Sequence, residues 1–384
     1  MSGGRYEQRG VSADKSEVHQ AIKNLDKGLY PNAFCKILPD IAANDASYCN
    51  LMHADTAGTK TSLAYVYWRE TGDLSVWEGI VQDALVMNLD DMACAGCIND
   101  FVVSSTIGRN KNLIPAEVLT ALIEAAPKFA QAMEAYGIKL HLAGGETADV
   151  GDIVRTADVG FTVFSRMPRK DVINIDIKEG DYIVGFAGYG QTNYESSYNG
   201  GMGSNGLTSA RHDVFHSLYA EKYPESFDPG INRALVYSGS KKLTDTVEVN
   251  GSVTTLGKLV LSPTRTFLPL LSRLVPAYRN QIHGIIHNTG GGLYKVDKFI
   301  GEGLCAVKDN LLPVPPLFQI IEQESGTTHM DMFKVFNMGT RLEIYTPDLK
   351  AAEIMIEEAG KLGIQAQIIG RVVSGENEKV KIID

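Results

Sequence analysis

Two hydrophobic patterns alternate along the chain, which predicts a mixed α/β protein. Apolar residues at helical spacing predict helices over 77–93, 112–136, 267–278 and 348–363, with a further helix beginning at 207. Runs of apolar or alternating residues predict strands over 138–143, 154–166, 182–186, 282–287, 342–345 and 366–373. Several of these strands lead directly into glycine-rich turns, so both halves of the chain repeat the same succession of features.

The length of 384 residues favours two domains, since one hydrophobic core rarely grows much beyond 250–300 residues. A charged turn at 178–181 precedes the strand 182–186 and separates two apolar regions. We therefore predict domains over residues 1–175 and 176–384. The hydrophobic content of 44% is sufficient for a large core in each.

The stretch 52–60 concentrates chemistry that suits a metal-bound polyphosphate. Asp55 provides a carboxylate for Mg²⁺, Gly58 lets backbone N–H groups approach oxygen atoms, and Thr59 and Lys60 add a hydroxyl and a positive charge. The spacing differs from a Walker A loop. A polar strand-to-helix connection with an N-cap is the alternative interpretation.

The helix predicted over 77–93 carries Asp83, Met87 and Asp91 on one stripe, at i, i+4 and i+8. Like charges on one stripe repel each other unless a cation or a donor lies between them. Negative charge is also unfavourable at a helix C-terminus. A metal ion or a partner lysine therefore explains Asp91 better than helix stability does, and a solvated acidic helix end remains the alternative.

Three further turns have the glycine content of anion-binding loops. They are Gly144, Gly145 and Glu146 after the strand 138–143; Ser204 and Asn205 in the tract 200–206; and Gly290 and Gly291 after the strand 282–287. A tight turn and a flexible linker are the alternatives for the first two. His283 and His287 are four residues apart on a strand, so they are expected to be packed or hydrogen-bonded rather than zinc ligands.

Charge and cysteine content exclude several classes of protein. The net charge of −10 argues against a nucleic-acid binder. No apolar run approaches eighteen residues, and the N-terminus lacks the apolar core of a secretory signal. Five cysteines are few for this length and favour a reducing cytosol, so we expect a cytoplasmic protein. Cys94 and Cys97 form a lone C-x-x-C pair, which we interpret as packing.

The motifs, taken in order, resemble the phosphoribosylformylglycinamidine cyclo-ligase (aminoimidazole ribonucleotide synthetase) family of purine biosynthesis. The family's D-G-x-G-T-K, N-D, G-G-E-T-A-E, S-N-G, P-T-R, T-G-G-G and F-N-x-G motifs correspond here to residues 55–60, 90–91, 144–149, 204–206, 263–265, 289–292 and 336–339. They extend over nearly the whole chain.

The resemblance implies a two-domain α/β fold, with an N-terminal sheet or barrel domain that forms a homodimer and a C-terminal α/β sandwich domain. It implies that ATP and Mg²⁺ drive ring closure of a small nucleotide substrate, formylglycinamidine ribonucleotide. Asp55 and Asp91 would hold the metal ion, and Lys60, Asp91 and Arg265 would act in catalysis. The nucleotide contacts would be Asp55, Gly58, Thr59, Lys60, Gly144, Gly145, Glu146, Ser204, Asn205, Gly290 and Gly291.

The chain departs from the family pattern at three places. Residues 29–34 stand where the family has an early glycine-rich loop, Gly203 replaces a histidine often found before S-N-G, and the loop around 191–201 is longer. Thiamine-monophosphate kinase, selenophosphate synthetase and a hydrogenase-maturation protein share the family's fold, so fold alone does not define the reaction. A related phosphotransferase and a non-catalytic nucleotide-binding scaffold are the alternative functions.

Overall fold

The computed structural model describes residues 5–11, 16–376 and 378–383. The N-terminal part is built on a mixed sheet with the strand order β1-β2-β5-β3-β4, in which β3 and β4 run parallel and the other pairs are antiparallel. Its strands are β1 (Ile37–Pro39), β2 (Tyr48–Thr56), β3 (Phe101–Arg109), β4 (Leu140–Asp149) and β5 (Ala157–Pro168). The helices of this part are α3 (Lys60–Thr71), α4 (Ser75–Cys94) and α5 (Ala116–Glu134), after the short α1 (Arg5–Gln8) and α2 (Ser16–Ile22).

The C-terminal part is built on a second sheet with the order β11-β13-β6-β14-β12-β15. Its strands are β6 (Tyr182–Ala187), β11 (Gly284–His287), β12 (Leu304–Lys308), β13 (Thr340–Thr346), β14 (Ala366–Ser374) and β15 (Val380–Ile382). The helices here are α6 (Leu207–Val214), α7 (Leu218–Lys222), α8 (Leu256–Val260), α9 (Leu268–Tyr278), α10 (Pro316–Ser325), α11 (His329–Val335) and α12 (Leu349–Lys361). Two small ribbons pair β7 (Tyr189–Gly190) with β8 (Asn199–Gly200), and β9 (Thr246–Val249) with β10 (Ser252–Thr255).

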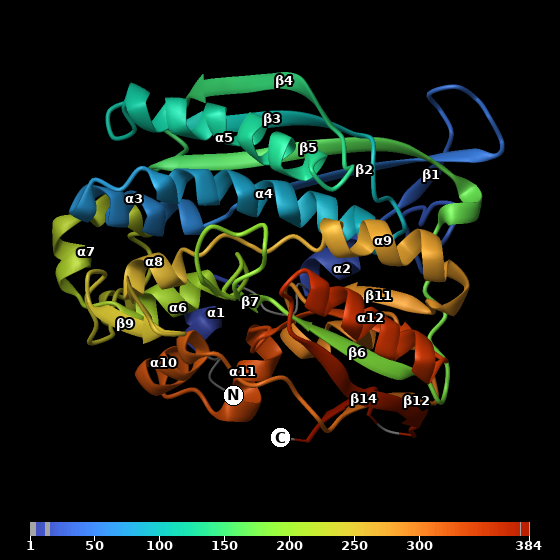
Figure 1. Ribbon diagram of the computed structural model, residues 1–384. Helices are drawn as coiled ribbons and strands as arrows, with labels where there is room; N and C mark the ends of the chain where they lie inside the picture. The colour runs from blue at the N-terminus through green and yellow to red at the C-terminus, as the bar shows by residue number, and fades with distance from the viewer. Residues whose placement is uncertain (1–4, 12–15, 377, 384) are drawn as a thin grey trace.

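Helix α4 lies between the two sheets. It packs against β2 and β5 on one side and against β11 and α9 on the other. Figure 1 shows it crossing the molecule, with the N-terminal sheet above and the C-terminal strands below. All but three of its twenty residues are buried, because both sides of the helix are covered. A functional stripe on α4 is therefore placed at the junction of the two domains.

The prediction of a mixed α/β fold with two domains is confirmed. The long helices predicted over 77–93 and 112–136 are observed as α4 and α5, and the helix expected from 207 is α6. The boundary after residue 175 stays a proposal; it lies between β5 and β6. Among the described residues, no helix combines the length and the apolar character needed to cross a membrane.

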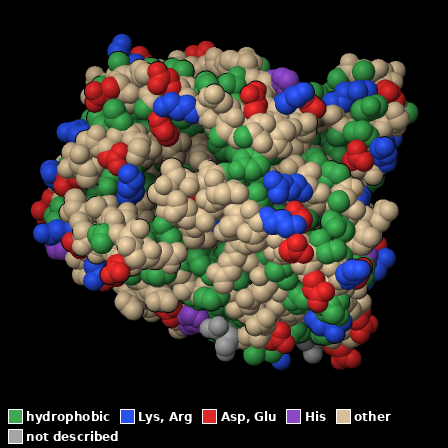
Figure 2. Space-filling view, viewed as in Figure 1, with side chains coloured by type: hydrophobic (Ala, Val, Ile, Leu, Met, Phe, Trp, Pro, Cys, Tyr) green, Lys and Arg blue, Asp and Glu red, His purple; other side chains and the backbone are tan. Residues whose placement is uncertain are grey.

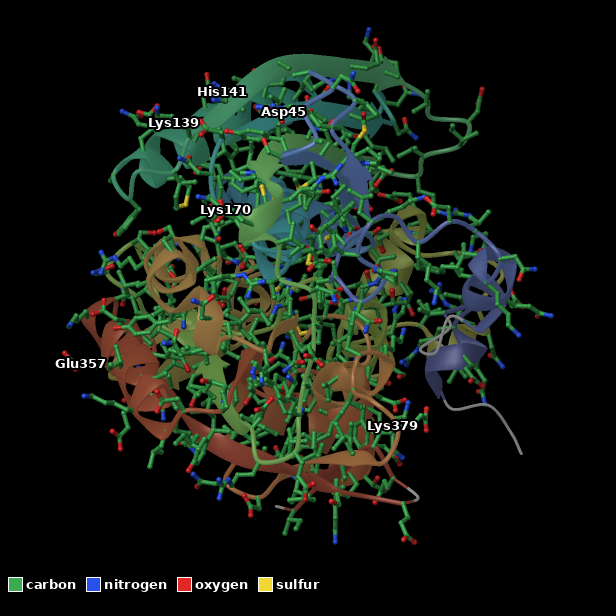
Figure 3. The ribbon with its side chains drawn as sticks, turned by 90° about the vertical axis from the view of Figure 1, so that its right-hand side faces the viewer. Asp45, Lys139, His141, Lys170, Glu357 and Lys379 are labelled. Carbon is green, nitrogen blue, oxygen red and sulfur yellow. The ribbon has the colours of Figure 1, made fainter. Side chains whose placement is uncertain are left out.

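One face of the N-terminal sheet is not covered by helices of the described chain. Met52 on β2 and Val102 on β3 are 62% and 39% exposed, and both pair with Phe164 of β5, so they share one face. They alternate with the inward-facing residues of their strands, as expected for a sheet packed on one side only. Figure 3 shows Lys139 and His141 projecting into solvent at the strand β4, which forms one edge of the sheet. We call the surface made by Met52 and Val102 the outer face.

Candidate active site

Lys60 does not lie where a phosphate contact would need it. Its side chain is fully buried, and Nζ is 2.9 Å from Asp83 Oδ1 and 2.6 Å from the Ser262 carbonyl oxygen. Burial lowers the pKa of Lys60, and the charge of Asp83 offsets part of this effect. Asp83 Oδ1 also accepts hydrogen bonds from Thr264 N and Oγ1. The structure thus corrects the expected role: Lys60 fastens the start of α3 to α4 and to the C-terminal domain.

Asp91, two helical turns further along α4, is joined to both domains. Its Oδ1 lies 2.8 Å from Nδ1 of His287, the last residue of β11, and its Oδ2 lies 3.7 Å from Nε2 of His53 on β2. Burial alone would raise the pKa of Asp91, but the hydrogen bond from His287 and the nearby cationic groups lower it. Burial lowers the pKa of His287 to about 4, so its ring is neutral near pH 7. The expected partner lysine is therefore a histidine.

Asp55 lies on the same strand and the same face as His53. Two residues along a strand advance about 7 Å, so the Asp55 carboxylate is one strand repeat away from the His53–Asp91 contact. Its Oδ1 accepts a hydrogen bond from Thr56 N. Asp55 and Asp91 thus belong to one region, whereas Lys60 is directed away from it.

The loop that follows Asp55 contacts the start of α6. Thr59 Oγ1 lies 2.7 Å from Thr208 Oγ1, which joins the exposed Gly58–Thr59 turn to the C-terminal domain. Ser204 Oγ and Asn205 Oδ1, just before α6, are buried without a hydrogen-bond partner among the described residues. Such atoms are rare in native proteins, because leaving them unpaired costs free energy. Both atoms are therefore candidates for contact with a ligand.

The turn after β11 meets the same loop. A Cβ placed on Gly290 would lie 3.2 Å from Asn205 Nδ2, so the 204–206 loop and the 290–292 turn are in close contact. Gly291 caps a 3-10 helix, η5 (Gly292–Lys298), which carries Lys295. Lys295 Nζ lies 3.2 Å from Thr289 Oγ1. Four segments of the chain therefore converge: the end of β2, α4, the loop before α6 and the turn after β11.

Gly144, Gly145 and Glu146 lie apart from this convergence. They form the exposed middle of β4, which is separated from β2 by β5 and β3 in the sheet. Ser105 lies against Gly145, where a side chain would overlap it. Within one chain these residues are on an edge strand facing solvent, away from the four converging segments.

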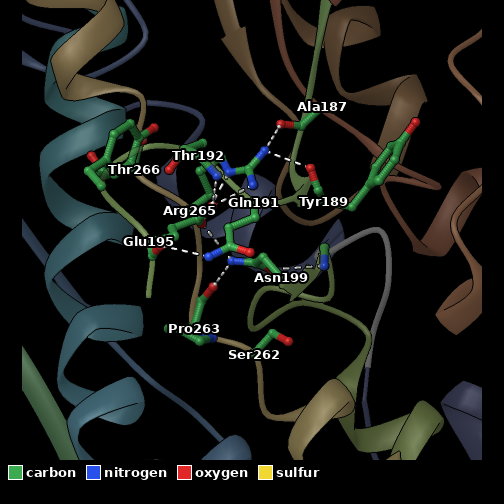
Figure 4. Close-up of polar contacts among 12 residues, drawn as sticks. Ala187, Tyr189, Gln191, Thr192, Glu195, Asn199, Ser262, Pro263, Arg265 and Thr266 are labelled. Atoms are coloured by element: carbon green, nitrogen blue, oxygen red, sulfur yellow. Dashed lines mark hydrogen bonds and ion pairs between the residues drawn. The ribbon is translucent and has the colours of Figure 1, made fainter. Parts of the chain in front are cut away.

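Arg265 also differs from its expected catalytic role. Its guanidinium is buried and donates to Glu195 through Nε and Nη2, and to the carbonyl oxygens of Ala187 and Tyr189 through Nη1, at 2.6–3.1 Å. Figure 4 shows these contacts beneath the loop that joins β7 to β8. Each nitrogen already has a protein partner, so we correct its role to that of an anchor for this loop.

The anchored loop forms one wall of a groove of about 930 Å³. The other walls come from the first half of α4, the second half of α5, β10 and the segment after α8. Ion pairs between Lys128 and Glu78 and between Lys258 and Asp73 lie along it. Figure 2 shows a hollow near the centre of this face, with acidic and basic side chains interspersed around it. The insertion predicted around 191–201 therefore shapes an open groove.

The donor atoms near Asp91 suit magnesium. Carboxylate oxygens are its preferred protein ligands, and in nucleotide sites the ion usually takes one or two carboxylates, with phosphate and water oxygens completing its shell. Asp55 and Asp91 supply that number. No group of three or more His, Cys, Asp or Glu residues arranged to hold a metal ion occurs within 5–11, 16–376 and 378–383, so an all-protein site is not indicated.

Sequence reasoning missed His53 and Arg341. His53 could have been found from strand alternation, because it lies two residues before Asp55 and shares its face. Arg341 carries no local signal; its donor Nε lies 3.1 Å from His287 Nε2, a contact between residues 54 positions apart. The expectation that His283 and His287 are hydrogen-bonded is confirmed, with His283 paired to Asp181 at 2.9 Å. The five cysteines are buried thiols, in agreement with a packing role.

The family models identify the class of protein. The AIR synthase related protein, C-terminal domain, matches residues 178–383, and the AIR synthase related protein, N-terminal domain, matches residues 38–167. The chain belongs to the AIR synthase related family, part of a superfamily of ATP-dependent enzymes.

The chain is similar to individual proteins of known name and to solved structures. The chain is 26% identical over 393 residues to the phosphoribosylformylglycinamidine cyclo-ligase of Alkaliphilus metalliredigens (strain QYMF), covering 98% of this chain and 97% of that protein. Its fold is similar to that of a chain in the HypE–HypF complex, with a TM-score of 0.53, 14% identity and coverage of 95% and 96%. It is also similar to AaThiL complexed with AMPPCP and TMP, with a TM-score of 0.50, 13% identity and coverage of 96% and 91%. At these identities the solved structures establish the fold alone.

Proposed function

We propose that the protein is an ATP-dependent cyclo-ligase that closes the imidazole ring of aminoimidazole ribonucleotide from formylglycinamidine ribonucleotide, releasing ADP and phosphate. The main observation in support is the contact of Asp91 with His287 and His53. It joins the two domains at the positions of the family's N-D and T-G-G-G motifs. The full-length similarity to a cyclo-ligase supports the choice of reaction.

ATP would phosphorylate the formamide oxygen of the substrate, and an internal nitrogen would then displace phosphate. Asp55 and Asp91 would hold a magnesium ion, which neutralises phosphate charge when it is bound. Gly58 and Thr59 would contact the nucleotide, and the 204–206 and 290–292 segments would line the opposite side. AMPPCP, an ATP analogue, is present in the AaThiL structure, which supports an ATP site in this fold.

The protein is further proposed to be a homodimer that pairs through the outer face. Met52 and Val102 expose apolar surface there, and such patches commonly mark protein–protein contacts. Pairing would also give Gly144, Gly145 and Glu146 of β4 a role, since an edge strand can reach the partner's site. They are separated from β2 of their own chain by β5 and β3.

The test is an ADP-release assay with ATP, Mg²⁺ and formylglycinamidine ribonucleotide. We expect turnover that requires the ribonucleotide, and a loss of at least 100-fold, an order-of-magnitude expectation for removing a group that stabilises charge, in the Asp91→Asn variant. Asp176→Asn, on an exposed segment between the domains, is the matched control and should retain activity. ATP turnover that is the same with and without the ribonucleotide would refute the proposal, and turnover with thiamine monophosphate would favour a kinase.

A further inference from the structure

Arg341 is a buried cation with no ion-pair partner among the described residues. Its side chain is 2% exposed, and no carboxylate of the described residues lies within ion-pair distance of it. Burial lowers the pKa of Arg341, and the more distant Asp83, Asp90 and Asp91 offset this only in part. A buried charge without a partner is costly, so its presence requires an explanation.

A β-bulge in β13 sets the direction of the Arg341 side chain. Arg341 is the extra residue of a β-bulge, because Thr340 and Leu342 of β13 oppose the adjacent residues Ala187 and Phe186 of β6. Bulges re-aim side chains and are frequent beside active sites. The guanidinium is thereby turned towards the loop before α6.

Glycine at position 203 makes room for the guanidinium. Gly203 has φ +66, and a Cβ built there would overlap the terminal nitrogens of Arg341. The side chain that the related family often carries before S-N-G could not be accommodated together with Arg341. The position of the Arg341 guanidinium therefore requires glycine at position 203.

Two of the three guanidinium nitrogens have protein acceptors. Nε donates to His287 Nε2 at 3.1 Å, and Nη2 donates to Met87 Sδ at 3.4 Å, a weak acceptor. Nη1 has no acceptor among the described residues, but it is not fully buried. The neighbouring Ser204 Oγ and Asn205 Oδ1 are fully buried and have no hydrogen-bond partner among the described residues. An uncompensated donor and two unpaired polar atoms thus adjoin the same loop.

We propose that Arg341 is an anion-binding residue, whose Nη1 donates to a phosphoryl oxygen of a ligand held between the 203–206 loop and the 290–292 turn. Ser204 Oγ donates to the same group, and Asn205 Oδ1 accepts from an N–H or O–H of the ligand. This deepens the proposed function by naming a phosphate contact, and the binding itself does not depend on which reaction follows. Arginine suits the task because its planar fork matches phosphate geometry.

The test uses metal-free protein, with inorganic phosphate, ADP and ribose 5-phosphate as separate probes. Thermal unfolding and calorimetry should show that phosphate or phosphorylated ligands raise the Tm of the unmodified protein. In Arg341→Met the affinity should fall about 10-fold or more, as expected for a hydrogen bond to a charged group. The probe whose affinity falls most identifies the bound group: ADP would indicate a nucleotide phosphate, and ribose 5-phosphate would indicate the phosphate of the second substrate. Arg371→Met, which removes an exposed charge on β14, is the control and should bind normally.

Stability without ligand separates a binding role from a structural one. Replacing an uncompensated buried charge by an apolar side chain of similar length is expected to leave the Tm unchanged or to raise it. A fall of several degrees, failure to fold, or an unchanged affinity for every probe would overturn the proposal.

A second variant displaces Arg341 without altering it. Gly203→Ala should reproduce the loss of binding, because the added Cβ occupies the position of the guanidinium. Gly326→Ala is the matched control: Gly326 has φ +65, but no described atom lies within 4 Å of an added Cβ. Unchanged phosphate binding in Gly203→Ala would contradict the proposal. The protein could bind phosphate through Arg341 and still show no cyclo-ligase activity. That result would refute the proposed reaction but would support the role of Arg341 in binding.

Discussion

Lys60 and Asp83 form an ion pair in which both side chains are fully buried. Two charges in such a place are stable only while both are present, since each compensates for the lost hydration of the other. Asp83 also holds Thr264, so the pair joins α3, α4 and the segment before α9. The lysine of a nucleotide-loop motif is therefore used here to hold the domains together.

Removing one partner of this pair should be strongly destabilising. We expect Lys60→Met to lower the free energy of unfolding by about 3–5 kcal/mol, because it leaves a buried carboxylate without its cation. Urea denaturation followed by circular dichroism measures this. Lys361→Met is the control: Lys361 pairs with Glu357 and Glu358 on an exposed face of α12, so its loss should change stability little. A Lys60→Met protein of unaltered stability that has lost ATP binding would restore the phosphate contact expected from the motif.

The residue-level limits of sequence reasoning follow from distance along the chain. The carboxylate of Asp91 was recognised because an acidic residue at a helix C-terminus is locally unfavourable. Its partner His287 lies 196 residues away, and no local pattern connects the two. Lys60 and Asp83 are 23 residues apart and Arg341 and His287 are 54 apart, so local patterns do not connect these pairs either.

At the scale of elements, the helices and strands followed from hydrophobic spacing, because α4, α5 and the sheet strands each bury a face that the pattern marks. The loop between β7 and β8 could not be predicted in the same way. Its conformation depends on Arg265, whose partner Glu195 is 70 residues away and whose other acceptors are backbone carbonyls. Backbone acceptors leave no trace in sequence.

The loop between β7 and β8 should depend on this anchor. In Arg265→Gln we expect amide hydrogen exchange over residues 189–200 to become faster, because Glu195 is left nearly buried without a cation. Exchange in α4 and in the N-terminal sheet should change less. Arg273→Gln is the control, since Arg273 is half exposed and only 3.9 Å from Glu358. Protection of 189–200 that survives Arg265→Gln would show that other contacts, such as Tyr194 Oη with the Thr266 carbonyl oxygen, are sufficient.

At the scale of the molecule, the proposed homodimer would explain both an uncovered apolar sheet face and a distant glycine loop. The outer face carries Met52 and Val102, and the Gly144–Gly145–Glu146 segment occupies the edge strand of the same sheet. Neither feature is useful to a single chain: an exposed apolar face and a free edge both favour unwanted association. In a dimer that pairs the outer faces, both are covered, and each β4 is brought near its partner.

The last prediction follows from that arrangement. Val102→Lys places a charge on the outer face and should convert a dimer into a monomer in sedimentation equilibrium, because a lysine cannot be buried there without a partner. Val253→Lys, at a 71% exposed position on β10 in the other domain, should remain dimeric. If β4 completes the partner's nucleotide site, the monomeric variant should also bind ATP more weakly, although Asp55 and Asp91 are untouched. A monomeric Val102→Lys protein with full ATP affinity would show that the nucleotide site does not need the dimer. A wild-type protein that sediments as a monomer would refute the proposed pairing.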